Sequence, residues 1–316
     1  QRIDTLIGYG GDVQLVLDLG IQYSPGWVNS IDPLVDQYGN VYQAGFPNGG
    51  VNVYWSPTVR QHVANYIQRV FSGINFRGRL WSVRVGPYRG ELMYPEQSPS
   101  EENLSFWAFD ARAQAQSPVP GWKPGDSSPN HEAERFYYWY VDNLTSTFDF
   151  FLGEIRRYYS GYVAPVTPGT GMHERAVARL ISEDLREASL KTYGTGNYWQ
   201  RIFSQLPGAD QNVINWCSSM GDRSGNDASA NWWEWSSAKM QAYLAQQSGR
   251  RIYGENSSPN AYDSSDGADP RTTMVTIFRT MQENNYLGLM WVSQSYMADP
   301  RYASLAQYAS LISQFK

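Results

Sequence analysis

Two glutamates, Glu91 and Glu255, each stand close behind a short apolar run that is typical of a buried strand, over residues 79–85 and 250–254. Each glutamate directly follows a glycine. Two carboxyl groups that face one reacting bond can divide the work of acid and base catalysis. One protonates the leaving oxygen, and the other attacks the carbon or activates a water, which is the usual chemistry of glycosidic bond cleavage.

The neighbours of the two glutamates predict different protonation states. Apolar residues flank Glu91 on both sides, and such surroundings favour the protonated form and suit an acid. Glu255 is followed by three polar residues that can hydrogen-bond an ionised carboxylate, Asn256, Ser257 and Ser258. We therefore expect Glu91 to act as the acid/base and Glu255 as the nucleophile.

Strands and helices alternate along the chain, which predicts βα units and a parallel sheet. The predicted strands cover residues 12–20, 79–85, 161–166, 212–217, 250–254 and 286–292. The predicted helices cover residues 56–70, 132–159, 174–190, 231–247, 272–284 and 303–315. No glycine-rich phosphate fingerprint follows any of these strands, so the pattern does not indicate a nucleotide site.

Long loops follow the predicted strands, and this favours a (β/α)8 TIM-type barrel within one domain of residues 1–316. Only six strands are found. Residues 51–55 form one irregular candidate strand, or the first two strands are missing from this chain. We favour the second explanation, because residues 2–10 look like the tail of a helix. An unclosed barrel has open sheet edges, so an oligomer or a partner segment could complete it.

The order of the strands resembles that of the clan A glycoside hydrolases. If Glu91 ends the fourth strand, the strand at residues 250–254 is the seventh, and Glu255 falls at its end. The resemblance implies an acid/base at Glu91 and a nucleophile at Glu255. It also implies that Trp291, at the end of the eighth strand, is the tryptophan that the clan commonly has in its sugar site.

Two short motifs refine this resemblance. Residues 16–20 with residues 24–27 resemble the third strand and its loop in the family 42 β-galactosidases. Residues 90–95, Gly-Glu-Leu-Met-Tyr-Pro, resemble a Gly-Glu-Leu-Arg-Tyr-Pro stretch of the β-amylases, which are inverting enzymes. Most clan members have an asparagine before the acid/base that binds the sugar 2-hydroxyl, whereas this chain has Gly90. Substrate and stereochemistry therefore stay open.

Composition narrows the classes of function. A net charge of −5 argues against a nucleic-acid-binding surface, and the absence of an 18-residue apolar run argues against a membrane span. Cys217 is the single cysteine of the chain, which has three histidines, so we expect neither a disulfide nor a metal or other cofactor.

Aromatic content is high, with 12 Trp and 23 Tyr among 316 residues. These side chains combine a flat apolar face, which can stack on a sugar ring, with a polar edge. The predicted substrate-binding residues are Trp27, Tyr88, Arg89, Trp216, Tyr253, Asn256 and Trp291.

These features together predict a retaining O-glycoside hydrolase that acts on a β-linked oligo- or polysaccharide by a two-glutamate double displacement. An inverting, β-amylase-like hydrolase is the first alternative, and a catalytically inactive carbohydrate-binding barrel is the second. A polysaccharide-degrading role and the scarcity of Lys and Cys favour an extracellular or periplasmic location.

Overall fold

The structure is a computed structural model that describes residues 14–43, 51–74, 77–96, 105–186, 193–222, 225–256, 260–265, 269, 272–292, 294–299 and 301–315. The chain divides into two compact units. Unit 1 comprises Gln1–Pro165 and Glu183–Gly196, and unit 2 comprises Val166–Ser182 and Asn197–Lys316. The single-domain organisation stays a prediction, and the predicted helix tail at residues 2–10 lies outside the described residues.

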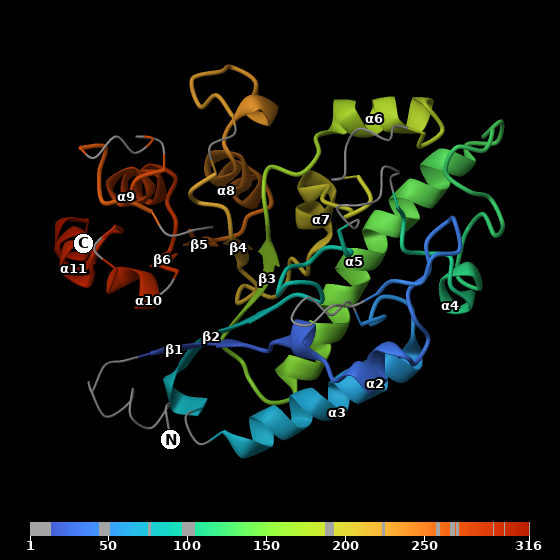
Figure 1. Cartoon of the computed structure of the whole chain (residues 1–316), viewed down its shortest axis with the longest axis horizontal. Coiled ribbons are helices and arrows are strands. Elements are labelled where there is room, and N and C mark those ends of the chain that lie inside the picture. The colour runs from blue at the N-terminus through green and yellow to red at the C-terminus, as the bar shows by residue number, and fades with distance from the viewer. Residues whose placement is uncertain are drawn as a thin grey trace. The chain divides into compact units, whose positions relative to one another are not determined.

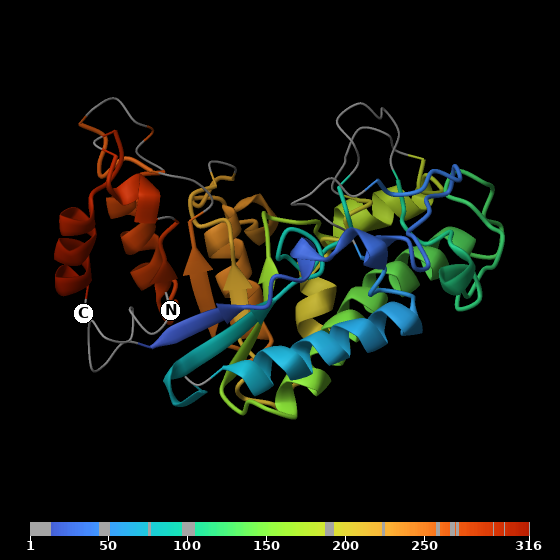
Figure 2. The same cartoon turned by 60° about the horizontal axis from the view of Figure 1, so that its bottom comes forward.

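Unit 1 contains the strands β1 (Leu15–Asp18) and β2 (Leu80–Val85) and the first four residues of β3 (Tyr162–Thr167). β1 pairs in parallel with β2, and β2 pairs in parallel with β3; the arrows of β1 and β2 lie side by side in Figure 2. The helices of this unit are η1 (Ile21–Tyr23), α2 (Gly26–Asn29), α3 (Pro57–Gly73), η2 (Arg77–Arg79), α4 (Ala111–Gln114) and α5 (Glu132–Arg156). Figure 1 shows α3 and α5 as its two long helices.

Helix α3 begins where its sequence predicts. The Ser56 hydroxyl accepts a hydrogen bond from the Val59 N–H at 3.1 Å, and Pro57 occupies the first turn, where no N–H is needed. Val59, Val63 and Ile67 recur every four residues and are buried. The segment of residues 51–55, the candidate irregular strand, forms a turn instead, because the chain folds back to start the helix.

Helix α5 carries the aromatic core of unit 1. The ring of Tyr140 stacks on the ring of Tyr94 with centroids 3.9 Å apart. The ring of Tyr54 packs against the same Tyr94 ring, with centroids 4.5 Å apart. The Tyr94 hydroxyl donates to the Tyr140 carbonyl at 2.9 Å, and the Tyr54 hydroxyl donates to the Met93 carbonyl at 2.6 Å. Burial raises the pKa of these three tyrosines well above 10. Much of the aromatic content therefore forms core.

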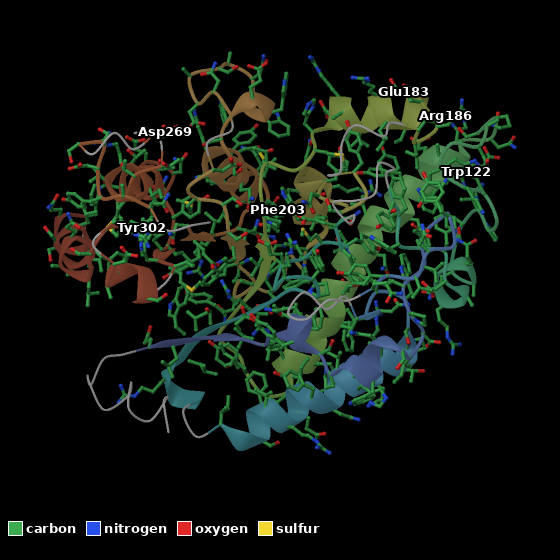
Figure 3. All side chains as sticks on the ribbon, in the orientation of Figure 1. Trp122, Glu183, Arg186, Phe203, Asp269 and Tyr302 are labelled. Carbon is green, nitrogen blue, oxygen red and sulfur yellow. The ribbon has the colours of Figure 1, made fainter. Side chains whose placement is uncertain are left out.

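A short segment after helix α6 (Glu174–Ser182) belongs to unit 1 through its contacts with the loop before α5. The Ser128 hydroxyl donates to the Asp184 carboxylate at 2.6 Å, and the Arg186 guanidinium donates to the Gly125 carbonyl at 2.9 Å. Figure 3 labels Arg186 of this segment and Trp122 of the loop before α5. These bonds tie residues that are about 60 positions apart in sequence into one unit.

Unit 2 contains the end of β3 and the strands β4 (Asn215–Cys217), β5 (Ile252–Glu255) and β6 (Leu289–Met290). Each strand pairs in parallel with the next, in chain order. The helices of unit 2 are α6 (Glu174–Ser182), α7 (Trp199–Gln205), η3 (Trp232–Glu234), α8 (Ser237–Gln247), α9 (Met274–Glu283), α10 (Gln294–Met297) and α11 (Leu305–Gln314).

The core of unit 2 around β4 to β6 combines aliphatic side chains such as Ala242 and Ile252 with the rings of Phe278 and Tyr286. Cys217 is fully buried in this cluster. Burial raises the pKa of the Cys217 thiol to about 12, so this cysteine packs as a small apolar residue.

Two predicted helices have different bounds in the structure, and the short helices have no counterpart in the prediction. The helix predicted over residues 174–190 ends at Ser182, because Asp184 and Leu185 adopt left-handed backbone angles that an α-helix cannot contain. The helix predicted over residues 231–247 begins at Ser237, after the separate turn η3. The sequence does not predict α2, α4, α7 or α10, since four to seven residues are too few to show a clear period.

The strand topology agrees with part of the predicted barrel. Six parallel strands follow one another in chain order within the described part of the chain, two fewer than a (β/α)8 barrel requires. No helix among the described residues is both long and apolar enough to cross a membrane. The same residues contain no group of three or more His, Cys, Asp or Glu side chains that could hold a metal ion.

Candidate active site

Glu91 closes a two-residue turn that follows β2. Its N–H donates to the Tyr88 carbonyl at 2.7 Å, and the Tyr88 N–H donates to the Glu91 carbonyl at 3.3 Å. Between them Arg89 and Gly90 have φ angles of +51° and +78°. Two successive left-handed residues define a tight hairpin turn. Glycine adopts this conformation without steric cost, whereas arginine carries a strain of about 1–2 kcal/mol.

Gly86 fixes where this turn lies. A Cβ atom at Gly86 would stand 2.2–2.4 Å from the backbone atoms of Glu91, far inside van der Waals contact. The Glu91 backbone therefore lies directly over the first residue after β2, and glycine alone allows that approach. The turn brings Glu91 back to the carboxyl end of its strand although five residues separate it from Val85.

Apolar and aromatic side chains surround the turn, as predicted. Tyr88, Leu92 and Met93 are buried, while the side chain of Glu91 is half-buried. Burial is the main cause that raises the pKa of Tyr88. The Arg89 guanidinium lies over the Tyr88 ring at 5.2 Å and forms an exposed ion pair with Glu96 at 2.6 Å.

The end of β1 adds residues that sequence analysis did not select. Asp18 forms an ion pair with Arg84 of β2 at 2.9 Å and accepts a hydrogen bond from the Gly20 N–H at 2.8 Å. A Cβ at Gly90 would lie 3.3 Å from the amide nitrogen of Gln22 and 3.6 Å from a carboxylate oxygen of Asp18. The only sequence signal was their position at the carboxyl end of a predicted strand.

Glu255 is the last residue of β5 and is 9% exposed. The indole N–H of Trp216, a fully buried residue of β4, donates to the Glu255 carboxylate oxygen Oε2 at 2.9 Å. In the sheet Trp216 pairs with Tyr253, two residues before Glu255, so all three side chains point to one face of the sheet. The register of β4 and β5 therefore holds this carboxylate.

Asn256 binds the start of the loop after β6. Its side-chain oxygen accepts from the Val292 N–H at 2.6 Å, and its amide donates to Asn260 at 3.1 Å. This side chain thus clamps two loops together. Hydrogen bonds from Asn256, Ser257 and Ser258 to the carboxylate of Glu255 stay a prediction, and the two serines lie outside the described residues.

Tyr253 lies two residues before Glu255 on β5, and Trp291 follows the neighbouring strand β6. The Tyr253 ring lies 4.4 Å from the Trp216 ring, and its pKa rises to about 12, chiefly through burial and then through the charges of Tyr308 and Glu255. Trp291 directly follows Met290, the residue that pairs with Glu255, and is 9% exposed.

A further cluster in unit 2 joins the loops after β3 and β4. The His173 ring stacks near the Trp233 ring with centroids 5.9 Å apart, and the Arg175 guanidinium lies 4.6 Å above that indole. Burial and then the charge of Arg175 lower the pKa of His173. Both loops leave the carboxyl ends of strands, which is where barrel enzymes carry their substrate-binding residues.

The predicted site residues fall into two groups. In unit 1 Tyr88, Arg89 and Glu91 share one turn, and Trp27 lines the same cavity as Arg89. In unit 2 Trp216, Tyr253 and Glu255 lie together, Asn256 follows Glu255 in sequence, and Trp291 directly follows the neighbouring strand β6. Each group stands at the carboxyl ends of parallel strands, where barrel enzymes carry their active sites.

Comparisons with known proteins agree with this fold. The chain is similar to the catalytic domain of β-amylase from Paenibacillus polymyxa, with a TM-score of 0.60 and 13% identity over 91% of this chain and 75% of that one. It is also similar to β-galactosidase from the psychrophilic Marinomonas ef1, with a TM-score of 0.55 and 10% identity over 92% of this chain. The chain spans 45% of that β-galactosidase chain.

No protein family and no curated protein matches the sequence. At such low identities the two structures show a shared fold and nothing finer. The described strands and helices therefore form part of a (β/α) barrel, a fold that the chain shares with these two solved structures.

Proposed function

We propose that this protein is a retaining O-glycoside hydrolase that cleaves a β-linked oligo- or polysaccharide, with Glu91 as acid/base and Glu255 as nucleophile. One observation carries the proposal. Each of the two glutamates is held at the carboxyl end of a parallel strand, β2 or β5, in a fold that resembles that of glycosidases.

The chemistry takes two steps. Glu91 donates its proton to the glycosidic oxygen while an oxygen of Glu255 bonds to the anomeric carbon, and the bond from that carbon to the leaving oxygen breaks. Glu91, now ionised, takes a proton from water as the water oxygen attacks the anomeric carbon and the bond to Glu255 breaks. Two inversions leave the anomeric configuration unchanged, Glu91 regains its proton, and no cofactor is consumed.

Trp216 supports the nucleophile role. Its N–H donates to Oε2 of Glu255 at 2.9 Å and so holds the carboxylate at the end of β5. Because Trp216 is fully buried and packed against Tyr253, the donor keeps its direction. A fixed carboxylate loses little freedom when it attacks, and this preorganisation lowers the barrier.

The half-buried setting of Glu91 supports the acid/base role. This residue must exchange a proton with a sugar oxygen in the first step and with water in the second. The buried Tyr88, Leu92 and Met93 provide an apolar surrounding, while the partial exposure of Glu91 allows water to reach it.

The remaining predicted residues complete the proposal. Trp27, Tyr88, Arg89, Trp216, Tyr253, Asn256 and Trp291 line the sugar subsites. A family 42-like specificity, a partner segment or an oligomer that completes the barrel, and an extracellular or periplasmic location are parts of the same proposal.

An inverting mechanism is the second candidate, favoured by the structural similarity to a β-amylase and by the Gly-Glu-Leu-Met-Tyr-Pro stretch. Proton NMR of the first sugar released from a β-linked substrate separates the two. A β-anomer supports retention, and an α-anomer supports inversion, for which the carboxyl groups would be about 6.5–9.5 Å apart rather than about 5–5.5 Å.

The test of the proposal is hydrolysis of a panel of 4-nitrophenyl β-glycosides and β-linked oligosaccharides. We expect Glu91→Gln and Glu255→Gln each to lower kcat by about 10²–10⁴-fold or more, since each removes one partner of the chemistry. Glu91→Gln should lose less on nitrophenyl glycosides, whose leaving group needs little protonation.

Two surface glutamates serve as matched controls, Glu134→Gln in α5 and Glu283→Gln at the end of α9. Both should keep full activity. Full activity of either Glu91→Gln or Glu255→Gln overturns the proposal. A wild-type protein that binds oligosaccharides and hydrolyses none of the panel would instead be a carbohydrate-binding barrel.

A further inference from the structure

A large cavity in unit 1 has no role in the two-step chemistry. Its volume is about 990 Å³, and it lies between the carboxyl end of β1 and one face of helix α3. Leu19, Ile21 and Val63 are buried and give it an apolar floor. Ligand pockets are typically of about 300–1,000 Å³, with a mostly apolar lining and a few polar groups, so the size and lining fit a ligand of several rings.

Three large aromatic side chains border this cavity and stay exposed. Tyr23 and Trp27 are each 56% exposed, and Tyr66 is 44% exposed. Tyr66 is anchored by its hydroxyl, which donates to the Leu19 carbonyl at 2.7 Å. Trp27 packs edge-on with His62 at 5.1 Å. Flat, partly anchored aromatic faces around one hollow suit the C–H faces of sugar rings.

A buried acceptor in the same cavity lacks a donor. Gln22 is 7% exposed, and its side-chain oxygen Oε1 accepts no hydrogen bond from any residue that the structure describes. A buried polar atom without a partner is unfavourable, and a ligand hydroxyl would satisfy it. Asn65 and Arg69 of α3 add exposed polar groups to the same wall.

The cavity reaches the turn that carries Glu91. Asp18, Gln22 and Arg89 line it, and the α-carbon of Gly90 lies so close to Gln22 that an added Cβ would stand 3.3 Å from its amide nitrogen. A chain molecule bound in the cavity would therefore end beside the turn that carries Glu91.

We propose that this cavity is an extended subsite that binds further sugar units of a neutral oligosaccharide, through stacking on Tyr23 and Trp27 and a hydroxyl donated to Gln22. The substrate class is then an oligosaccharide of several units rather than a short glycoside. This inference rests on the proposed function for its catalytic meaning, although binding itself does not require catalysis.

Another occupant has to be distinguished. Within the described residues β1 pairs with β2 alone, so a polypeptide strand could add to its other edge and cover part of the cavity. The exposed aromatic faces and the unpartnered amide oxygen favour a glycan, because a strand added to β1 would bond to its backbone and not to Gln22.

The test is calorimetric titration of the Glu255→Gln protein, whose substitution lies in the other unit, with cellotetraose, xylotetraose and β-1,4-galactotetraose. We expect at least one to bind. Trp27→Ala and Tyr23→Ala should each weaken that binding by about tenfold, and Gln22→Leu by about three- to tenfold. Tyr38→Ala, an equally exposed tyrosine of unit 1 that does not line the cavity, should bind as before.

Binding that none of the three cavity substitutions weakens overturns the subsite. The absence of binding by all three oligosaccharides also overturns it. In that case, sedimentation could show a concentration-dependent dimer that the same substitutions abolish, and this result would identify the cavity as a polypeptide-binding surface. The two proposals can fail separately. If oligosaccharide binding depends on Trp27 but the wild type hydrolyses no substrate, the subsite proposal stands and the proposed hydrolase function is wrong.

Discussion

The two units hold their glutamates in different ways. Unit 1 places Glu91 by backbone geometry, through a tight turn with two left-handed residues packed over Gly86. Unit 2 places Glu255 by a side chain, through the indole N–H of Trp216 on the neighbouring strand. The turn in unit 1 fixes the main chain of Glu91 and leaves its side chain half-buried. The hydrogen bond in unit 2 holds the carboxylate of Glu255 itself.

This difference fits the two roles that we propose for Glu91 and Glu255. An acid/base must exchange protons with two successive partners, and a half-buried side chain on a rigid turn can do so. A nucleophile must present one oxygen in one direction, and a buried hydrogen-bonded carboxylate does that. Substitutions in the Glu91 turn and substitutions of Trp216 should therefore differ in their effects on stability and on activity.

The largest effect should come from Gly86→Ala. The new Cβ would stand 2.2–2.4 Å from the Glu91 backbone, so the turn must move. We expect kcat to fall by at least about 100-fold, because a displacement of about 1 Å can cost that much, and the melting temperature to fall as well. Activity assays and thermal unfolding measure both.

Gly153→Ala is the control for Gly86→Ala. Gly153 lies inside helix α5 of the same unit, and nothing lies within 4 Å of an added Cβ. This substitution should leave activity unchanged and stabilise the protein by about 0.5–1 kcal/mol. A Gly86→Ala protein that behaves in the same way would contradict the proposed backbone placement of Glu91.

A smaller effect should follow from Trp216→Phe. The substitution keeps an aromatic ring but removes the N–H that holds Glu255, and a hydrogen bond to a charged group is worth about 1.5–3 kcal/mol. We expect kcat to fall by about 10–100-fold and the free energy of unfolding to fall by about 1–3 kcal/mol.

Trp199→Phe is a control that separates the loss of kcat from the loss of stability. Trp199 is also fully buried in unit 2, and its N–H donates to the Pro168 carbonyl at 3.0 Å. Its substitution should lower stability to a similar degree while kcat stays close to that of the wild type. Equal losses of kcat in both variants would mean that Trp216 has only a structural role.

The smallest effect concerns pH. The pKa of Tyr253 is raised to about 12 in the folded state, compared with about 10 in an unfolded chain. Its contribution to stability is therefore fully present below pH 10 and is lost as the pH rises towards 12. Tyr253→Phe should reduce the alkaline loss of stability by about 1 kcal/mol at pH 11, as measured by urea unfolding at pH 8 and pH 11. An unchanged loss would contradict the raised pKa.

Local sequence patterns could predict most elements of the fold and the places of both glutamates. The Ser56-Pro57 start of α3 and the apolar runs of β2 and β3 follow from capping and burial alone. The early end of α6 could not be predicted, because the left-handed angles of Asp184 and Leu185 depend on contacts with the loop at Gly125 and Ser128.

The contacts within the candidate site depend on strand register. Trp216 and Tyr253 were selected as residues that stack on sugars, but their pairing across β4 and β5 is what brings an N–H to Glu255. Register arises from the whole sheet and leaves no local signal in one sequence. Gln22 was missed for a similar reason, since only the fold brings it beside Gly90.

The most direct test of the two roles is azide rescue of Glu91→Ala and Glu255→Ala on a 4-nitrophenyl β-glycoside that the wild type hydrolyses. With Glu255 absent, azide should attack from its side of the sugar and give an α-glycosyl azide. With Glu91 absent, azide should attack the glycosyl-enzyme and give a β-glycosyl azide. These opposite anomers, read by NMR, are the predicted result. Exchanged anomers, or full activity of either variant without azide, would contradict the assignment.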